Sequence, residues 1–235
     1  MSFYQEITPY YDQIFPINEK TERFLSICFK GKKSLLDVGA GTGNMALSLA
    51  SKGFMVIATE PEEMMAKEIR RKGISGHVHL KVYTKTMEQI NEFTETFDGI
   101  YCIGNTLAHL NSLEEISQFL HQSYQHLSEE GILIIQMVNF EKVLHNQDFS
   151  FPKIEKNTFT FERRYELKDE NILFTTILTT NKESISNTIS LFPATATQMI
   201  PLLNNCGFRD IAQYGNYEFG SYSINSPALI LVAKK

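Results

Sequence analysis

Cysteine is scarce in this chain of 235 residues, and the three that occur lie far apart, at Cys28, Cys102 and Cys206. An odd number of widely spaced cysteines in apolar contexts suits small buried side chains and gives no disulfide framework. The sequence also lacks an apolar run near the roughly 20 residues that cross a bilayer, and its N-terminus lacks the pattern of a signal peptide. We therefore expect a soluble, cytoplasmic protein without a membrane partner.

Positive charge is not in excess either. The formal net charge is -5 and the pI is about 5.7, and basic residues form only short groups such as Lys32-Lys33 and Arg70-Arg71-Lys72. A nucleic-acid partner is not expected, because phosphate binding needs a basic surface. No metal is predicted, because His77 and His79 have no third ligand placed near them. A nucleophilic Ser-His-Asp arrangement and a Walker glycine-lysine run are also missing.

The chain does contain a regular alternation of short apolar runs and helical patterns. Strands are expected at 34–38, 54–59, 77–83, 97–103, 131–138, 208–214 and 227–233, with helices near 18–29, 43–52, 62–73, 111–127 and 195–205. Such alternation is typical of βαβ units around a parallel sheet. The length and the hydrophobic content of 43% allow one full α/β domain and a modest appendage.

The pattern changes between about 148 and 193, where alternating Thr-rich and aromatic-rich stretches replace helical periodicity. Three strands are expected there, at 159–167, 172–180 and 185–192, forming a small antiparallel meander. Alternation places Arg163 on the apolar face of the first strand, with Phe161 and Tyr165. Arg163 could reach a carboxylate substrate. It could instead reach a partner subunit of a possible homodimer. The alternative is an edge-strand charge that prevents aggregation.

A glycine-rich turn follows the first strand, in the order Asp37, Gly39, Gly41, Gly43 and Asn44. Glycines let the main chain approach a ligand closely, so the turn predicts a bound small molecule. A dinucleotide fingerprint would need glycine where Asn44 stands. The carboxylate of Asp37 would repel a phosphate and attract a sulfonium or ammonium group. A cationic nucleoside therefore fits better than a nicotinamide dinucleotide.

The pattern Asp37-x-Gly39-x-Gly41-x-Gly43 resembles the glycine-rich motif of class I S-adenosylmethionine (SAM)-dependent methyltransferases, whose later landmarks follow over nearly the whole chain. The resemblance implies an α/β, Rossmann-like, seven-stranded, mostly parallel sheet with an antiparallel last strand, and the predicted meander is a small antiparallel β insert that departs from a minimal methyltransferase. Residues 1–147 and 194–235 would form the SAM-binding domain, with an N-terminal lid over about 1–30. Residues 148–193 would form a β-meander insert that covers the acceptor site.

The resemblance also implies SAM as the cofactor and S-adenosylhomocysteine as its product. Glu60 ends the second strand about twenty residues after the glycines, where a carboxylate can accept both ribose hydroxyls. Glu60 could equally cap the next helix, because Glu60-Pro61-Glu62-Glu63 is a good helix start. The residues expected to line the cofactor are Tyr11, Asp37, Gly39, Gly41, Gly43, Asn44, Glu60, Pro61, Met65, Thr86, Met87, Ile103 and Gly104.

The segment from Gly104 to Leu110 resembles the Gly-Asn-Ser-x-x-His-Leu signature of glycine N-methyltransferases and their small-molecule relatives. By that resemblance Asn105 and His109 would line the acceptor pocket as catalytic residues. If the segment is helical, both project to the same side. The alternative for His109 is a histidine that caps the loop between strand and helix.

Three residues are expected to bind the acceptor: Asn139, Arg163 and Tyr165. Asn139 follows the position where glycine N-methyltransferases carry a carboxylate-binding arginine, and this chain has Val138 in that position. Valine cannot replace a bidentate guanidinium, so glycine itself is disfavoured unless Arg163 or another basic group substitutes. Tyr165 belongs to an aromatic set that suits either cation–π contact with an amine or stacking on a ring.

The predicted function is methyl transfer from SAM to a nitrogen of a small-molecule acceptor by in-line SN2 displacement. One alternative is O-methylation with His109 as the general base. Another is a SAM-binding module without catalysis, and a third is a nicotinamide-dependent oxidoreductase, which Asp37 and Asn44 disfavour.

Overall fold

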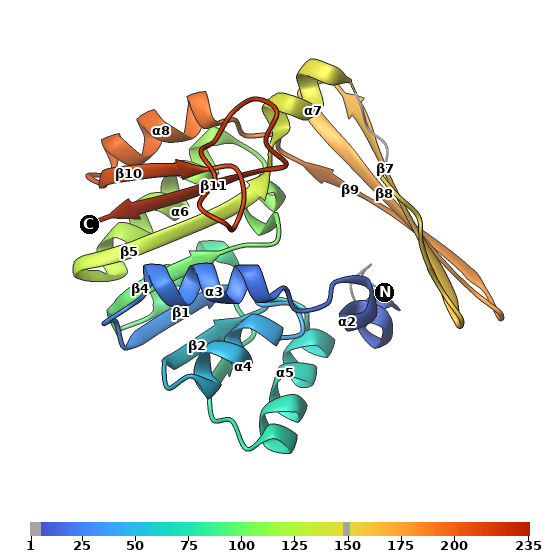
Figure 1. The fold of residues 1–235 in the computed structure, drawn as a ribbon, viewed down its shortest axis with the longest axis horizontal. Coiled ribbons are helices and arrows are strands. Elements are labelled where there is room, and N and C mark those ends of the chain that lie inside the picture. The colour runs from blue at the N-terminus through green and yellow to red at the C-terminus, as the bar shows by residue number, and fades with distance from the viewer. Residues whose placement is uncertain (1–5, 148–150) are drawn as a thin grey trace.

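The computed structural model describes residues 6–147 and 151–235, and its centre is a seven-stranded sheet (Figure 1). The strands are β1 (Ser34–Val38), β2 (Met55–Thr59), β3 (Lys81–Tyr83), β4 (Phe97–Cys102), β5 (Leu127–Val138), β10 (Arg209–Tyr214) and β11 (Ala228–Lys234). Their order is β10-β11-β5-β4-β1-β2-β3. β11 runs antiparallel to both of its neighbours, β10 and β5, and the other pairs of the sheet are parallel. The predicted fold class is confirmed, including the antiparallel last strand.

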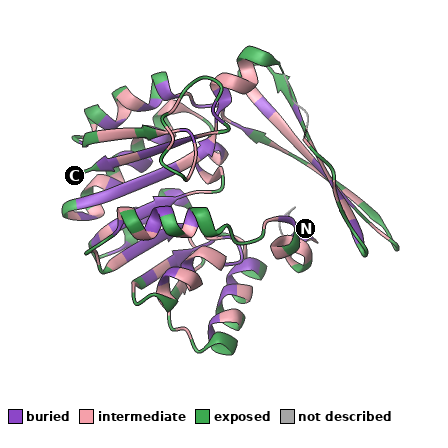
Figure 2. Ribbon diagram, in the orientation of Figure 1, coloured by how far each residue is buried: buried purple, intermediate pink, exposed green. Residues whose placement is uncertain are grey.

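Helices cover both faces of this sheet because adjacent strand residues point to opposite sides. Leu35 packs with α3 (Glu19–Cys28), α4 (Asn44–Ser51) and α5 (Glu63–Gly76). Leu36, the next residue, packs with α6 (Leu113–His126), α8 (Ala196–Asn205) and the 3-10 helix η2 (Met87–Glu92). Figure 2 shows the resulting buried strands between partly exposed helices. Within the described ranges, no helix is long and apolar enough to cross a membrane.

Two strands begin well away from their predicted starts. Strand β3 starts at Lys81 instead of 77, because α5 continues to Gly76 and His77 closes it with a left-handed φ of 54°. The amide of Val78 then donates to the Gly73 carbonyl at 2.9 Å, which ends the helix. Strand β5 begins at Leu127 instead of 131, since Leu127 pairs with Phe97 across a register shift.

The insert is a separate antiparallel sheet of four strands in the order β6-β7-β8-β9. They are β6 (Ile154–Lys156), β7 (Phe159–Lys168), β8 (Asn171–Thr180) and β9 (Ser184–Leu191). Three correspond to the predicted meander, and β6 was missed because three residues are too few to show a period. The sheet extends from α7 (Phe140–Asn146), which was also unpredicted, as a long twisted arm towards the N-terminal segment (Figure 1). The first predicted insert residues, 148–150, lie outside the described residues.

The N-terminal segment joins the insert to the main domain. It consists of the 3-10 helix η1 (Thr8–Tyr10) and the short helix α2 (Tyr11–Ile14). Ile7 and Ile14 are buried against Phe161 of β7 and Met65 of α5. The lid was predicted over about 1–30, but α3 packs on the sheet through the fully buried Phe24. Of the described residues in the predicted lid, therefore, those before α3 pack with the insert and α5, and a lid role for them stays a prediction.

Candidate active site

The glycine turn lets neighbouring segments pack closely against the main chain after β1, because its glycines have no side chains. Gly39, Gly41 and Gly43 have φ values of 74°, 59° and 80°. A Cβ on Gly39 would lie 2.3 Å from Thr106 Cγ2, and one on Gly43 would lie 2.7 Å from Ile69 of α5. Gly43 therefore serves helix packing, and Gly39 permits the close approach of the segment after β4.

Glu60, at the end of β2, lies beneath the glycine turn and is only 6% exposed. Its Oε2 accepts a hydrogen bond from the Gly41 amide at 2.8 Å, and its Oε1 accepts one from the Glu62 amide at 3.0 Å. The carboxylate thus binds the turn and the residue that precedes α5, so it is also a helix-start residue. Burial raises the pKa of Glu60 to about 7.

Asp37, at the end of β1, is buried beside the same turn at 2% exposure. Burial raises its pKa to about 8, and the neighbouring Glu60 carboxylate adds to the shift. Neither acid has an ion-pair partner among the described residues. Two buried acids without a basic neighbour favour a cationic ligand and disfavour a phosphate.

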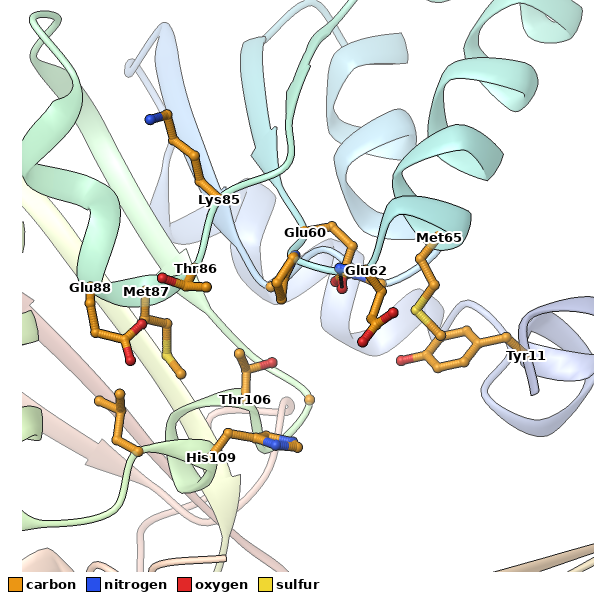
Figure 3. Close-up of a pocket in the computed structure, with 15 residues that line it drawn as sticks. Tyr11, Glu60, Glu62, Met65, Lys85, Thr86, Met87, Glu88, Thr106 and His109 are labelled. Carbon is orange, nitrogen blue, oxygen red and sulfur yellow. Dashed lines mark hydrogen bonds between the residues drawn. The ribbon is translucent and has the colours of Figure 1, made fainter. Parts of the chain in front are cut away.

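A cavity of about 270 Å³ opens in front of Glu60 (Figure 3). Met87 and Glu88, from the turn after β3, lie on one side of it, and Met65 and Tyr11 lie on the other. The lining residues are Tyr11, Gly39, Gly41, Glu60, Pro61, Glu62, Met65, Lys85, Thr86, Met87, Glu88, Gly104, Thr106, His109 and Leu110.

A second cavity, of about 250 Å³, continues from the first. The two share Tyr11, Gly39 and Gly104, so together they form one bent cleft along the carboxyl edge of the sheet. The second is lined by Tyr11, Phe15, Pro16, Ile17, Asn18, Thr21, Asp37, Gly39, Ala40, Thr42, Asn44, Met45, Ile103, Gly104, Gln136 and Tyr217. Among the residues predicted to line the cofactor, only Gly43 lines neither part.

Tyr11 stands at the junction of the two cavities. Burial, together with the carboxylates of Glu60, Asp12 and Asp37, raises the pKa of its hydroxyl well above the usual range. The hydroxyl therefore stays protonated and can donate a hydrogen bond into the cleft. Tyr11 belongs to α2, which contacts the glycine turn.

Polar contacts between lid, turn and α5 hold Tyr11 there. Asp12 accepts hydrogen bonds from the Thr42 hydroxyl at 2.5 Å and from the Asn44 amide at 2.9 Å. Lys72 forms an ion pair with Asp12 at 2.5 Å and donates to the Asn44 side chain at 2.8 Å. Asn44, predicted as a cofactor residue, thus uses its side chain to hold the lid.

The segment after β4 places His109, but not Asn105, at the cleft. Asn105 has a left-handed φ of 68° and precedes the 3-10 helix η3 (Thr106–His109). Its Oδ1 accepts a hydrogen bond from the Val138 amide at 3.0 Å, and its side chain lines neither cavity. The condition for a common side of Asn105 and His109, a helical segment that includes both, is not met, because the helical turn begins after Asn105. Burial lowers the pKa of His109, so its ring is neutral at pH 7.

None of the three residues predicted for the acceptor lines the described cavities. Asn139 is 1% exposed and donates to the carbonyls of Ser223, Ile224 and Ser226, while its Oδ1 accepts from Lys142 and Tyr222. These bonds occupy its amide and fix the loop between β10 and β11, so Asn139 does not present a group to an acceptor. Tyr165 is buried against Phe140, Phe151 and Phe174. Arg163 is half-buried on the inner face of β7.

Gln136 is the clearest functional residue that sequence reasoning missed. It lines the second cavity, accepts a hydrogen bond from the Gly104 amide at 2.7 Å and accepts another from the Tyr217 hydroxyl at 3.2 Å. A polar residue inside the apolar run of β5, at the carboxyl end of a central strand, was the available signal. In the part of the chain that is described, no three His, Cys, Asp or Glu side chains gather as a metal site.

Known proteins share this architecture. A family model described as a methyltransferase domain matches residues 35–131. An uncharacterized methyltransferase of Alkaliphilus oremlandii is 30% identical over 162 residues, which cover 68% of this chain and 69% of that protein. A SAM-dependent methyltransferase structure from Clostridium acetobutylicum superposes with a TM-score of 0.85 at 14% identity, over 99% of each chain. The chain belongs to the class I SAM-dependent methyltransferases; it is an enzyme, and SAM is its cofactor.

Among more specific relatives, the glycine/sarcosine N-methyltransferase of Aphanothece halophytica is 26% identical over 223 residues. The match covers 87% of this chain and 77% of that protein. Membership in a methyltransferase family rules out the nicotinamide-dependent oxidoreductase.

Proposed function

We propose that this chain transfers the methyl group of SAM to a nitrogen atom of a small-molecule acceptor. The observation that carries the proposal is the position of His109, a neutral imidazole in the wall of a cleft that two buried acids, Glu60 and Asp37, also line. A neutral amine needs orientation and a dry site more than it needs a strong base. The likeness to glycine/sarcosine N-methyltransferases supports nitrogen as the target atom.

The residues of the cleft fit SAM from end to end. Glu60 would accept the ribose hydroxyls with the lone pairs that Gly41 and Glu62 leave free. Thr86, Met87 and Met65 would enclose the adenine ring at one end, where the lining is largely apolar. Asp37 and Gln136 would hold the methionine ammonium at the other. When bound, SAM supplies a methyl group on a sulfonium, which is already a strong electrophile.

His109 then acts as an orienting and proton-accepting group at the acceptor end. Its neutral ring can accept a hydrogen bond from an amine and hold the proton that the amine loses after transfer. The lid and the insert would exclude water from this end of the cleft, because Tyr11 and Met65 belong to the cluster that joins them.

O-methylation with His109 as general base is the second candidate, and the lowered pKa of His109 favours it. A base that is neutral at pH 7 can remove the proton from a phenol as the methyl group is transferred. The two candidates differ in the atom that carries the methyl group in the product.

The test is a reaction of the purified protein with SAM and matched amine and phenol acceptors, with mass spectrometry to locate the methyl group. We expect N-methylated products and S-adenosylhomocysteine in equal amounts. His109→Gln should bind SAM normally by calorimetry and turn over more slowly. Formation of methyl ethers alone would contradict N-methylation and support O-methylation. Normal turnover in His109→Gln would contradict the catalytic role of His109.

A further inference from the structure

The insert presents one of its faces to the rest of the molecule. Residues that pair across antiparallel strands point to the same face, so the register arranges side chains in rows. Two rows are apolar: Phe161, Leu178 and Ile185 form one, and Tyr165, Phe174 and Ile189 form the other. Between them lies what we call the polar row, which consists of Arg163, Thr176 and Asn187.

The first apolar row is fixed to the lid side of the cleft. Phe161 and Leu178 share a buried cluster with Ile7, Ile14 and Met65. Met65 itself lines the first cavity, opposite His109 in Figure 3. This end of the insert therefore lies at the wall of the cleft that the lid forms.

The second apolar row is fixed to the side that carries His109. Tyr165 belongs to the main core, together with Leu107 and Ala108 of η3. The amide of Phe192, which follows β9, donates to the Ala108 carbonyl at 2.8 Å. The two apolar rows therefore pack on opposite sides of the acceptor end of the cleft. The polar row lies between them and faces that end of the cleft.

The side chains of the polar row have donors without partners. Thr176 is 2% exposed, and its hydroxyl has no hydrogen-bond partner among the described residues; the same holds for the buried Nε of Arg163. Asn187 is half-buried, and no side-chain hydrogen bond is recorded for it within the described ranges. The buried hydroxyl of Thr176 and the buried Nε of Arg163 cost free energy unless a ligand or a water satisfies them.

Arg163 also lacks a counter-charge. Its guanidinium carbon lies 4.9 Å above the Phe151 ring, and its Nη2 makes a long 3.5 Å contact with the Pro152 carbonyl. No carboxylate in the described ranges pairs with it, whereas Arg164, on the opposite face, pairs with Glu162. Burial lowers the pKa of Arg163, because removing water from the guanidinium disfavours its charged form. A bound anion would offset this loss of free energy.

Building on the methyltransferase function proposed above, we propose that the polar row binds an anionic oxygen group, a carboxylate or a phosphate, carried by the methyl acceptor. Arg163 supplies the charge, and Thr176 and Asn187 supply hydrogen bonds. The row would bind the anionic group that the apolar Val138, at the end of β5, cannot bind. The rings of Phe151 and Phe174 beside it suit an acceptor with an apolar body larger than that of glycine.

The test uses calorimetric titration of the protein saturated with S-adenosylhomocysteine. The probes are benzoate, phenylphosphonate and benzamide, which share a ring and differ in the charge and shape of the polar group. We expect one of the two anions to bind at least about tenfold more tightly than benzamide, as a charged hydrogen bond predicts. The better anion identifies the group as a carboxylate or a phosphate.

Substitutions in the polar row test whether it causes the preference for an anion over benzamide. Arg163→Met should abolish it, Arg163→Lys should keep part of it, and Thr176→Val should reduce it severalfold. Arg164→Met is the matched control, because it removes the same charge from the exposed face. It should leave the preference for the anion unchanged.

Three outcomes would overturn the inference: no preference for either anion in the natural protein, a preference that survives Arg163→Met, or equal losses in Arg163→Met and Arg164→Met. If Arg163→Met does not fold, the nearly isosteric Thr176→Val decides, and an unchanged preference there also refutes it. Binding of S-adenosylhomocysteine in the same titrations separates the two proposals. Normal binding without an anion preference refutes only the polar row, whereas no binding refutes the proposed function on which it rests.

Discussion

The cofactor edge of the sheet and the insert are built in different ways. At the cofactor edge, Glu60 and Gln136 bond to backbone amides, so the position of each wall is set by main-chain geometry. The insert is held by ring contacts, such as those of Phe161 with Phe15 and of Tyr165 with Phe140. Backbone hydrogen bonds fix one geometry, whereas apolar contacts tolerate changes of shape and volume. The molecule therefore combines a cofactor edge that main-chain hydrogen bonds fix with an insert that side-chain packing holds in place.

The sharpest way to break this comparison is to remove one ring from the main domain that carries the cofactor edge and one from the insert. Phe119→Ala, on the buried side of α6, should lower the free energy of unfolding by about 3–5 kcal/mol. Phe161→Ala should instead open the insert and lid locally, because its cluster is separate from the main core. Hydrogen exchange measured by mass spectrometry should show faster exchange over β7, β8 and α2 only. Exchange that rises equally over β1 and β4 would show that the insert is part of one cooperative unit.

The next largest effect is expected at the cofactor edge. Glu60→Ala removes the acceptor for the Gly41 amide and for the ribose, so affinity for SAM should fall about 100-fold, or roughly 3 kcal/mol. Calorimetry measures the loss, and Glu114→Ala, an exposed acid of α6, is the control. An affinity that falls less than about threefold would mean that main-chain geometry holds the turn without the carboxylate.

The pH dependence of binding should sharpen the contrast further. Asp37 and Glu60 have raised pKa values of about 8 and about 7, so they bind protons near pH 6 in the free enzyme. A cation favours their ionised forms and lowers both pKa values, so SAM binding releases protons. Affinity should then rise by about tenfold or more between pH 6 and pH 7. Titrations in buffers of different ionisation enthalpy count the protons, and Asp37→Asn should reduce the count. Proton uptake on binding would contradict this assignment.

The smallest effect is expected where lid and turn meet. Asp12 and Lys72 form a partly exposed ion pair, so their coupling energy in a double-mutant cycle of Asp12→Asn and Lys72→Met should be about 1 kcal/mol or less. The readout is the dissociation rate of SAM, which should rise in both single variants. Independent effects of the two substitutions would show that the pair does not hold the lid.

Sequence alone was sufficient for the parts of the fold that repeat. The seven strands of the main sheet and the three long strands of the insert follow from period and spacing, and the turn from Asp37 to Asn44 follows from its glycines. The three-residue strand β6 carries too little pattern to be detected. The lengths of β3 and β5 depend on where a helix stops and where a partner strand begins, which the local sequence does not state.

The cofactor side of the site could be predicted because its residues lie close to the ends of recognisable strands. The acceptor side could not, because it depends on contacts between distant segments. Asn139 bonds to a loop more than eighty residues later, and Asn105 turns to β5 because of one left-handed φ. The unpartnered donors of the polar row likewise appear only when three strands are placed in register.

Both connections of the insert reach the same part of the core. α7 enters it through Phe140, and the chain leaves it through Leu191 and Ala194, all three buried in one cluster. The glycine turn, Glu60 and Gln136 belong to strands that the insert does not interrupt. If the arm covers the acceptor as proposed, exchanging the sheet between α7 and α8 would change the acceptor and leave the cofactor residues of the main sheet in place.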